Sequence, residues 1–169
     1  MTDGGVIQPG TPAPEFTLRR GGGEEFTRAD LEGKTTVLVF YPFAFSPVCT
    51  DQLNLYDEVL SDFEAAGATL YGVSCDATYT QTAFREKLGV RIEQLSDFEP
   101  KGEACRAFGV YHPGGFPQRA LVIVGPDAVV QWSYEAPSPG ELPGANLIFD
   151  GLAAAAAPGA AAPAPGSPA

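Results

Sequence analysis

Hydrophobic residues along the chain form short continuous runs, separated by segments in which they recur at helical spacing. The run at 36–41, TVLVFY, is rich in β-branched and aromatic residues, which is typical of a strand buried on both faces. Shorter runs at 69–74 and 119–124 predict further strands. Helical spacing, ended in three cases by glycine, predicts helices over residues 49–66, 78–88, 102–108 and 146–152.

Two pairs of short strands are predicted to form hairpins. Residues 16–18 and 25–27 flank three consecutive glycines, and residues 119–124 and 129–133 flank the turn sequence GPD. Strands that alternate with helices and finish in a hairpin indicate an α/β fold. We therefore expect a central mixed β-sheet flanked by helices, preceded by an N-terminal β-hairpin.

The chain has 20 glycines and 16 prolines, more than is usual for a soluble domain, and most of this surplus lies at the two ends. Residues 153–169 form an Ala/Pro-rich segment without charges or large side chains, which predicts a disordered tail because it can bury little apolar surface. Residues 1–8 are predicted to be a flexible N-terminus. One domain over residues 9–152 remains, and its length allows a core without help from disulfides or metal.

The charge balance argues against some partners. The 10 basic and 21 acidic residues give a net charge of −11 and a pI of about 4.3, which disfavours nucleic acid and anionic membranes. No apolar stretch approaches the roughly 20 residues that span a bilayer, and the opening residues do not resemble a secretory signal. We therefore predict a cytoplasmic protein that binds neither nucleic acid nor membrane.

Three cysteines and a single histidine limit the candidate chemistry. Cys49, Cys75 and Cys105 are widely spaced, so the close ligand pairs of a structural zinc site are missing. We predict no metal and no cofactor. The cysteines are then either buried inert thiols, or one of them is a reactive thiol with helpers.

Cys49 is the strongest candidate for a reactive thiol, because it stands where a predicted helix begins after a buried strand. The first helical turn has free N–H groups and the positive end of the helix dipole, which favour a thiolate. Ser46 supplies a hydroxyl one turn earlier, and Pro42 can shield the sulfur without offering an N–H group. The alternative is a small buried apolar residue, the commonest role of a free cysteine.

The sequence PFAFSPVC at 42–49 resembles the Pxxx(T/S)xxC signature of the peroxiredoxins. Five further segments resemble the family in the same order, over about residues 9–150: GTPAPEFTL, LEGKTTVLVFYP, YGVSCDATYTQTAFREKLGV, LSDFEPKGEACRAFGVY and RALVIV. The LSDF segment and the single motif cysteine most resemble the one-cysteine alkyl hydroperoxide reductase E subgroup. This resemblance implies a thioredoxin-like fold and thiol-dependent reduction of hydrogen peroxide and organic hydroperoxides.

The resemblance also implies roles for individual residues. Cys49 takes the place of the peroxidatic cysteine, which peroxide oxidises to a sulfenic acid. Ser46 would bind the peroxide by a hydrogen bond, and Pro42 falls on the motif proline. Arg119 falls on the arginine that holds the thiolate and the peroxide oxygens. Many relatives have glutamate where this chain has Gln52, which brings no charge to pair with an arginine, so its part in the site stays open.

The step that regenerates the thiol is less constrained. Neither Cys75 nor Cys105 falls on a resolving position of two-cysteine relatives, so an external thiol or a thioredoxin-like reductant is expected. Cys75 remains a possible internal resolving residue, because its strand should end near the active site. Cys105 is expected to pack within a helix. The resemblance further implies a homodimer, and the competing class is a redox sensor or holdase that is oxidised without efficient turnover.

Other residues near the predicted site are given structural roles. Phe40 and Phe43 are expected in the core, whereas Phe45 lies in the loop and could contact an organic hydroperoxide. His112 lies in a Gly/Pro-rich segment and is expected to be a surface loop residue.

Overall fold

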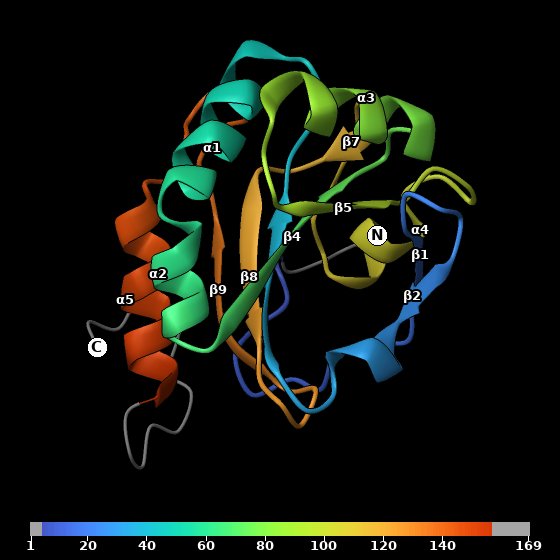
Figure 1. Ribbon diagram of the computed structural model, residues 1–169. Helices are drawn as coiled ribbons and strands as arrows, with labels where there is room; N and C mark the ends of the chain where they lie inside the picture. The colour runs from blue at the N-terminus through green and yellow to red at the C-terminus, as the bar shows by residue number, and fades with distance from the viewer. Residues whose placement is uncertain (1–4, 157–169) are drawn as a thin grey trace.

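The computed structural model describes residues 5–156. Seven strands form one mixed sheet in the order β2-β1-β5-β4-β3-β8-β9 (Figure 1). These strands are β1 (Thr17–Arg19), β2 (Glu25–Thr27), β3 (Thr35–Phe40), β4 (Ala68–Ser74), β5 (Glu93–Ser96), β8 (Ala120–Val124) and β9 (Val130–Glu135). A separate small hairpin is made of β6 (Tyr111–His112) and β7 (Phe116–Pro117).

Five α-helices and one 3-10 turn complete the described part of the chain. They are α1 (Pro47–Glu58), α2 (Leu60–Ala65), α3 (Thr78–Leu88), α4 (Glu103–Ala107), α5 (Ala145–Ala156) and the turn η1 (Arg28–Leu31). Within residues 5–156, none of the helices has the length and apolar character needed to cross a membrane.

The strand order confirms the predicted α/β architecture. Strands β3, β4 and β5 run parallel, whereas β8 pairs antiparallel with β3, and β9 antiparallel with β8. Both predicted hairpins are present, as β1-β2 and β8-β9. Since β3 and β4 are parallel, their carboxyl ends meet at one edge of the sheet, at the top of Figure 1, and α1 starts from that edge.

The two faces of the sheet build two separate cores. Successive side chains of a strand point to opposite faces, so Val39 packs with residues of α1, α2, α3 and α5, whereas Phe40 packs with α4 and the N-terminal segment. Figure 1 shows α1, α2 and α5 on one side of the sheet and α4 on the other, while β1 and β2 extend the sheet at one edge. Cys49 belongs to the first core, and Cys75 and Cys105 belong to the second.

The predicted helix over 49–66 is corrected to two helices that meet at Val59. The Val59 N–H bonds to the Tyr56 carbonyl only three residues back, at 3.3 Å, instead of continuing the α-helical pattern. The guanidinium of Arg91 donates to the freed Asp57 carbonyl at 3.1 Å, and the Asp57 carboxylate accepts the Arg91 N–H at 2.7 Å. A contact from a distant segment therefore compensates the break.

Both predicted ends of the domain need correction. Helix α5 continues to Ala156, so the first four residues of the predicted tail are helical, as expected for alanine, the best helix former. At the other end, the Ile7 N–H donates to the Phe108 carbonyl at 2.9 Å, and Val6 and Ile7 pack against the core. The remaining parts of the predicted tail and N-terminus, residues 157–169 and 1–4, lie outside the described residues.

Strand β5 was not predicted, because its sequence EQLS contains only one strongly apolar residue. The strand lies between β4 and β1, and its buried Gln94 side chain is satisfied within the fold. Gln94 accepts from the Tyr41 hydroxyl at 2.6 Å and donates to the Ile92 carbonyl at 3.0 Å. Burial of a polar strand residue is tolerated here because both of its polar atoms are hydrogen-bonded.

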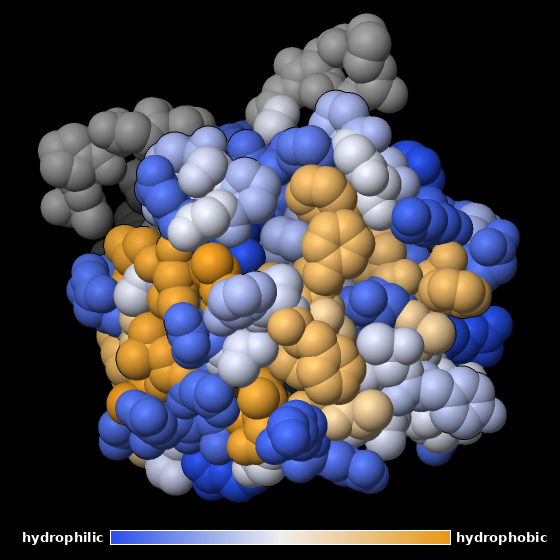
Figure 2. All heavy atoms as spheres, turned by 90° about the horizontal axis from the view of Figure 1, so that it is seen from above, coloured by the Kyte–Doolittle hydropathy of each residue, from blue (hydrophilic) through white to orange (hydrophobic). Residues whose placement is uncertain are grey.

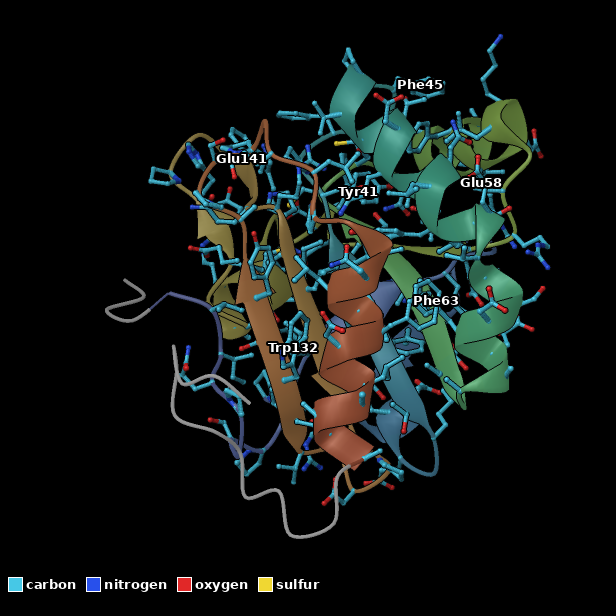
Figure 3. All side chains as sticks on the ribbon, turned by 90° about the vertical axis from the view of Figure 1, so that its left-hand side faces the viewer. Tyr41, Phe45, Glu58, Phe63, Trp132 and Glu141 are labelled. Carbon is cyan, nitrogen blue, oxygen red and sulfur yellow. The ribbon has the colours of Figure 1, made fainter. Side chains whose placement is uncertain are left out.

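Helix α5 approaches the sheet closely at Gly151. A Cβ atom added there would lie 2.6 Å from the Trp132 ring and 2.9 Å from Ile123 Cδ1. Figure 3 shows Trp132 beneath α5, with Phe63 beside the same helix, and Phe63 stacks on Phe149 of α5 at 4.3 Å between ring centroids. The aromatic side chains of Trp132 and Phe63 therefore fix how closely α5 packs against its neighbours.

We predict that Gly151→Ala lowers the free energy of unfolding by about 1–2 kcal/mol. Overpacking against Trp132 costs about 1–3 kcal/mol, and the better helix propensity of alanine recovers up to about 1 kcal/mol. Urea denaturation measures the change, with Gly22→Ala as a matched control because a Cβ there meets only the Glu24 side chain at 3.7 Å. An unchanged or more stable Gly151→Ala protein contradicts the close approach.

Candidate active site

The residues after β3 place Cys49 in the first turn of α1, as predicted. Ser46 is the N-cap of α1, and its carbonyl accepts the Thr50 N–H at 2.9 Å. Pro47 follows at the first helical position, where its fixed φ suits the helix and no N–H needs a partner. The Cys49 thiol is thus close to the N-terminus of the helix, and the residue is 0% exposed.

The loop that leads into α1 is held in an uncommon conformation. Phe45 has a φ of 71°, in the left-handed region that non-glycine residues seldom adopt. The Asp76 carboxylate accepts the Ala44 N–H at 2.8 Å, and the Phe45 ring packs 5.1 Å from that of Phe84. Figure 3 shows Phe45 at the start of α1, with Tyr41 deeper in the molecule. These contacts offset the backbone strain next to the thiol.

Arg119 makes three hydrogen bonds at the site. Its Nη2 donates to Cys49 Sγ at 3.3 Å, and its Nη1 donates to Gln52 Oε1 at 2.6 Å. Its Nε donates to the Pro139 carbonyl at 2.7 Å. Arg119 directly precedes β8, and the pairing of β8 with β3 brings it to the sheet edge from which α1 starts. The sheet register therefore delivers the guanidinium to the sulfur.

The charge of Arg119 is not neutralised by a carboxylate. The residue is only 2% exposed, and no carboxylate in the described range 5–156 lies within 4.0 Å of its guanidinium. Its three acceptors are a sulfur, an amide oxygen and a backbone carbonyl. A buried cation without an anionic partner is costly. The sulfur of Cys49 is thus one of only three acceptors for this buried cation in the described part of the chain.

Gln52 contacts both Arg119 and Tyr56. Its Nε2 donates to the Tyr56 hydroxyl at 3.2 Å, and that hydroxyl donates to the Pro143 carbonyl at 2.6 Å. Burial raises the pKa of Tyr56 to about 12, so the phenol keeps its proton at neutral pH. This chain of bonds turns the amide so that its oxygen faces Arg119.

The structure brings together only some of the predicted site residues. Cys49 and Arg119 are in direct contact, Ser46 lies one turn before Cys49, and Pro42 is buried in the loop. Cys75 does not join them, because it lies in the core on the opposite face of the sheet. Cys105 is fully buried in α4, as expected, and has Cys75 as a neighbour.

Three contributions to the site were missed from the sequence. Tyr56 received no role in the site, although its spacing of four residues from Gln52 could have suggested a contact. Asp76, which anchors the loop, gave no recognisable signal. The carbonyls of Pro139 and Pro143 could not be predicted from the sequence. Every residue has a backbone carbonyl, so the residue type does not indicate which one accepts a hydrogen bond.

Aromatic side chains gather around the outer side of the loop. Phe43 is 48% exposed, which corrects its predicted core position, because it lies beyond the end of the buried strand. Its ring lies 5.0 Å from Phe116, which stacks on His112 at 4.3 Å. His112 is thus half-buried in strand β6 instead of a surface loop. Figure 2 views the molecule from the top of Figure 1, where the parallel strands end, and shows apolar side chains in orange exposed on that surface.

The chain belongs to the AhpC/TSA family, whose sequence pattern matches residues 9–133. Alkyl hydroperoxide reductase E of Mycobacterium bovis is 30% identical over 151 residues, which cover 88% of this chain and 98% of that protein. Peroxiredoxin 2 of Thermoplasma acidophilum is 29% identical over 134 residues, 76% of this chain and 67% of that protein. These similarities agree with the resemblance drawn from the motifs.

Solved structures of peroxiredoxins share the fold. Reduced Prx3 of Vibrio vulnificus in complex with hydrogen peroxide gives a TM-score of 0.79 at 25% identity, covering 87% of this chain and 99% of that chain. AhpC of Enterococcus faecalis gives 0.78 at 25% identity, covering 88% and 92%. The thioredoxin-like fold is confirmed, and the protein is a thiol peroxidase of the peroxiredoxin type.

The buried Tyr56 phenol predicts a loss of stability at alkaline pH. Its pKa is raised from the usual 10.0 to about 12 by burial, so its stabilising contribution is complete below pH 10 and is lost as the pH rises towards 12. The free energy of unfolding should fall by about 1.4 kcal/mol per pH unit above 10 from this group. Burial raises the pKa of Tyr41 as well, which adds to the decline.

Urea denaturation between pH 8 and 11 tests this contribution in Tyr56→Phe. At pH 8 the variant should be less stable by about 1–2 kcal/mol, because the buried Pro143 carbonyl loses its donor. The difference from the unsubstituted protein should shrink above pH 10, whereas Tyr79→Phe, at an exposed position, should follow the unsubstituted protein throughout. A constant difference across the range refutes the assignment.

Proposed function

We propose that the protein reduces hydroperoxides by a one-cysteine cycle, with Cys49 as the peroxidatic residue and an external thiol as the reductant. The observation that carries the proposal is the 3.3 Å contact between Arg119 Nη2 and Cys49 Sγ at the start of α1. The thiolate attacks the terminal peroxide oxygen, the O–O bond breaks, and a sulfenic acid and water or an alcohol are formed.

The groups around the sulfur suit this displacement. Negative charge moves from the sulfur to the leaving oxygen, and Arg119 is placed to stabilise it without reorganisation. The free N–H groups of the first turn of α1 and the Ser46 hydroxyl can hold the two peroxide oxygens. Pro42 shields the sulfur, and Gln52 keeps the guanidinium in place.

Access to the sulfur requires a movement of the loop. Cys49 is fully buried, and Ala44 packs against the core that contains it. Phe43 and Phe45 lie exposed on the same loop and give its outer side an apolar character. An organic hydroperoxide can rest its apolar part on these rings, which supports organic hydroperoxides as substrates beside hydrogen peroxide.

An external reductant fits the separation of the cysteines. Neither Cys75 nor Cys105 shares a core with Cys49, so the sulfenic acid is left for an outside thiol or a thioredoxin-like protein. The exposed rings beside the site also offer an apolar surface to a second copy, which supports the predicted homodimer. A cytoplasmic location, where such reductants are kept reduced, stays a prediction.

Replacement of the peroxidatic cysteine gives the first test. With one equivalent of hydrogen peroxide, the reduced protein should gain one oxygen that dimedone traps, and Cys49→Ser should not. With excess thiol, the protein should consume many equivalents of peroxide. Consumption that stops near one equivalent favours a redox sensor or holdase, and dimedone found only on peptides that lack Cys49 excludes Cys49 as the peroxidatic residue. Intact mass and peroxide consumption are the measurements.

Replacement of the arginine tests the contact itself. Arg119→Lys keeps the charge but cannot reach Cys49, Gln52 and the Pro139 carbonyl at once, so the rate constant with peroxide should fall about 10²- to 10³-fold. Stopped-flow measurement of the oxidation step shows the effect. Arg19→Lys, at an exposed pair with Glu25, should leave the rate unchanged. A less than threefold change in Arg119→Lys argues against this role of the guanidinium.

A further inference from the structure

A second cluster of reactive groups lies on the face of the sheet opposite Cys49. The Sγ atoms of Cys75 and Cys105 and a carboxylate oxygen of Asp97 all lie within 4.8 Å of one another. All three residues are buried, with exposures of 8%, 0% and 3% for Cys75, Cys105 and Asp97. The peroxidase mechanism proposed for Cys49 uses none of them.

Strand pairing and helix capping assemble the cluster. Cys75 follows β4 and Asp97 follows β5, and these strands are parallel neighbours whose register pairs Ser74 with Ser96. The Asp97 N–H donates to the Ser74 carbonyl at 2.8 Å. The Asp97 carboxylate accepts the N–H groups of Ala104 at 3.1 Å and Cys105 at 2.8 Å, at the start of α4. The carboxylate thereby fixes α4 with its thiol next to Cys75.

The surroundings of the two thiols differ. Burial raises the pKa of Cys105 well above its usual value, and the neighbouring Cys75 and Asp97 raise it further. Burial also raises the pKa of Asp97. In the range 5–156, no lysine, arginine or histidine forms an ion pair with Asp97. Cys75 is the less deeply buried residue of the two, at 8% against 0%, so we take it as the thiol that an outside oxidant meets first.

We propose that Cys75 and Cys105 form a second redox couple, a dithiol that closes to a disulfide, in which Asp97 accepts the proton of Cys105. The couple acts independently of Cys49, because the sheet separates the two sites. The oxidant is a hydroperoxide, the class of compound that peroxiredoxins reduce.

The reaction proceeds in two balanced steps. Cys75 attacks the hydroperoxide, the O–O bond breaks, and Cys75 becomes a sulfenic acid while water or an alcohol leaves. Cys105 then attacks the Cys75 sulfur while its proton passes to the Asp97 carboxylate, Asp97 returns that proton to the departing hydroxide, and water leaves as the S–S bond forms. Two thiols lose two electrons and two hydrogens in total, and one hydroperoxide is reduced.

A disulfide fits the cluster better than a bound metal ion. Two thiols and a carboxylate supply three ligands, whereas a structural zinc site takes four. Both Asp97 oxygens already accept backbone N–H bonds, which tie the carboxylate to α4. Disulfide formation needs only the two sulfurs to approach each other, and it removes two ionisable groups from an apolar core.

The test uses the full chain with Cys49→Ser, so that the outcome does not depend on the proposed peroxidatic role. After reduction and exposure to excess hydrogen peroxide, the protein is unfolded, alkylated and weighed. We expect a loss of two hydrogens and a linked peptide that contains Cys75 and Cys105. Cys49→Ser/Cys75→Ser is the matched control and should show no such loss, with circular dichroism to verify its fold.

The opposite results overturn the proposal. If both thiols remain open to alkylation, or if Cys75 stops at a sulfenic acid that dimedone traps, the two cysteines are not a couple. Stoichiometric zinc in the purified protein would assign the cluster to metal binding instead. Failure of the Cys49 cycle would appear separately, as missing dimedone on the Cys49 peptide of the protein that retains Cys49.

Asp97→Asn in the Cys49→Ser background tests the proton transfer. Asparagine keeps an oxygen to accept a backbone N–H at the start of α4 but cannot take up a proton. Disulfide closure should slow about tenfold or more at pH 7 and should regain speed as the pH rises, because hydroxide replaces the missing base. A rate and a pH profile equal to those of Cys49→Ser assign Asp97 to helix capping alone.

Discussion

The hydrogen bond from Arg119 to Cys49, at 3.3 Å, is the contact on which the active site depends. A buried guanidinium needs acceptors for its donors, and here they come from α1 and from the segment that follows β9. Arg119 itself is delivered by the antiparallel pairing of β8 with β3. The site therefore exists only when the sheet, the helix and the late loop are all in place.

The neutral side chain of Gln52 determines how the charge of Arg119 is used. A glutamate at this position would pair with the guanidinium and would share its charge with the sulfur. The amide keeps the hydrogen bond, at 2.6 Å, and leaves the positive charge uncompensated by any carboxylate within 4.0 Å in the described part of the chain. The Tyr56 hydroxyl holds the Gln52 amide in the orientation that lets its oxygen accept from Arg119. Uncharged groups therefore keep the guanidinium in contact with the sulfur.

The features that could be predicted from the sequence are those with a local cause. The β-branched run at 36–41 marks β3, and the proline and serine before Cys49 mark a helix start. The features that could not be predicted arise from contacts between distant segments. The break at Val59 is accompanied by a contact from Arg91, the buried strand β5 has its Gln94 side chain hydrogen-bonded by Tyr41, and the Arg119 Nε donates to the Pro139 carbonyl.

The alternation of side chains in the central sheet separates two kinds of cysteine chemistry. Cys49 lies on the face covered by α1, and its sulfur accepts a hydrogen bond from the Arg119 guanidinium. Cys105 lies on the other face beside the Asp97 carboxylate, which disfavours the thiolate. The residue type is the same, but the neighbouring charge has the opposite sign, a guanidinium beside Cys49 and a carboxylate beside Cys105. Cysteine count and spacing cannot reveal this difference, because it is set by which face of the sheet each residue reaches.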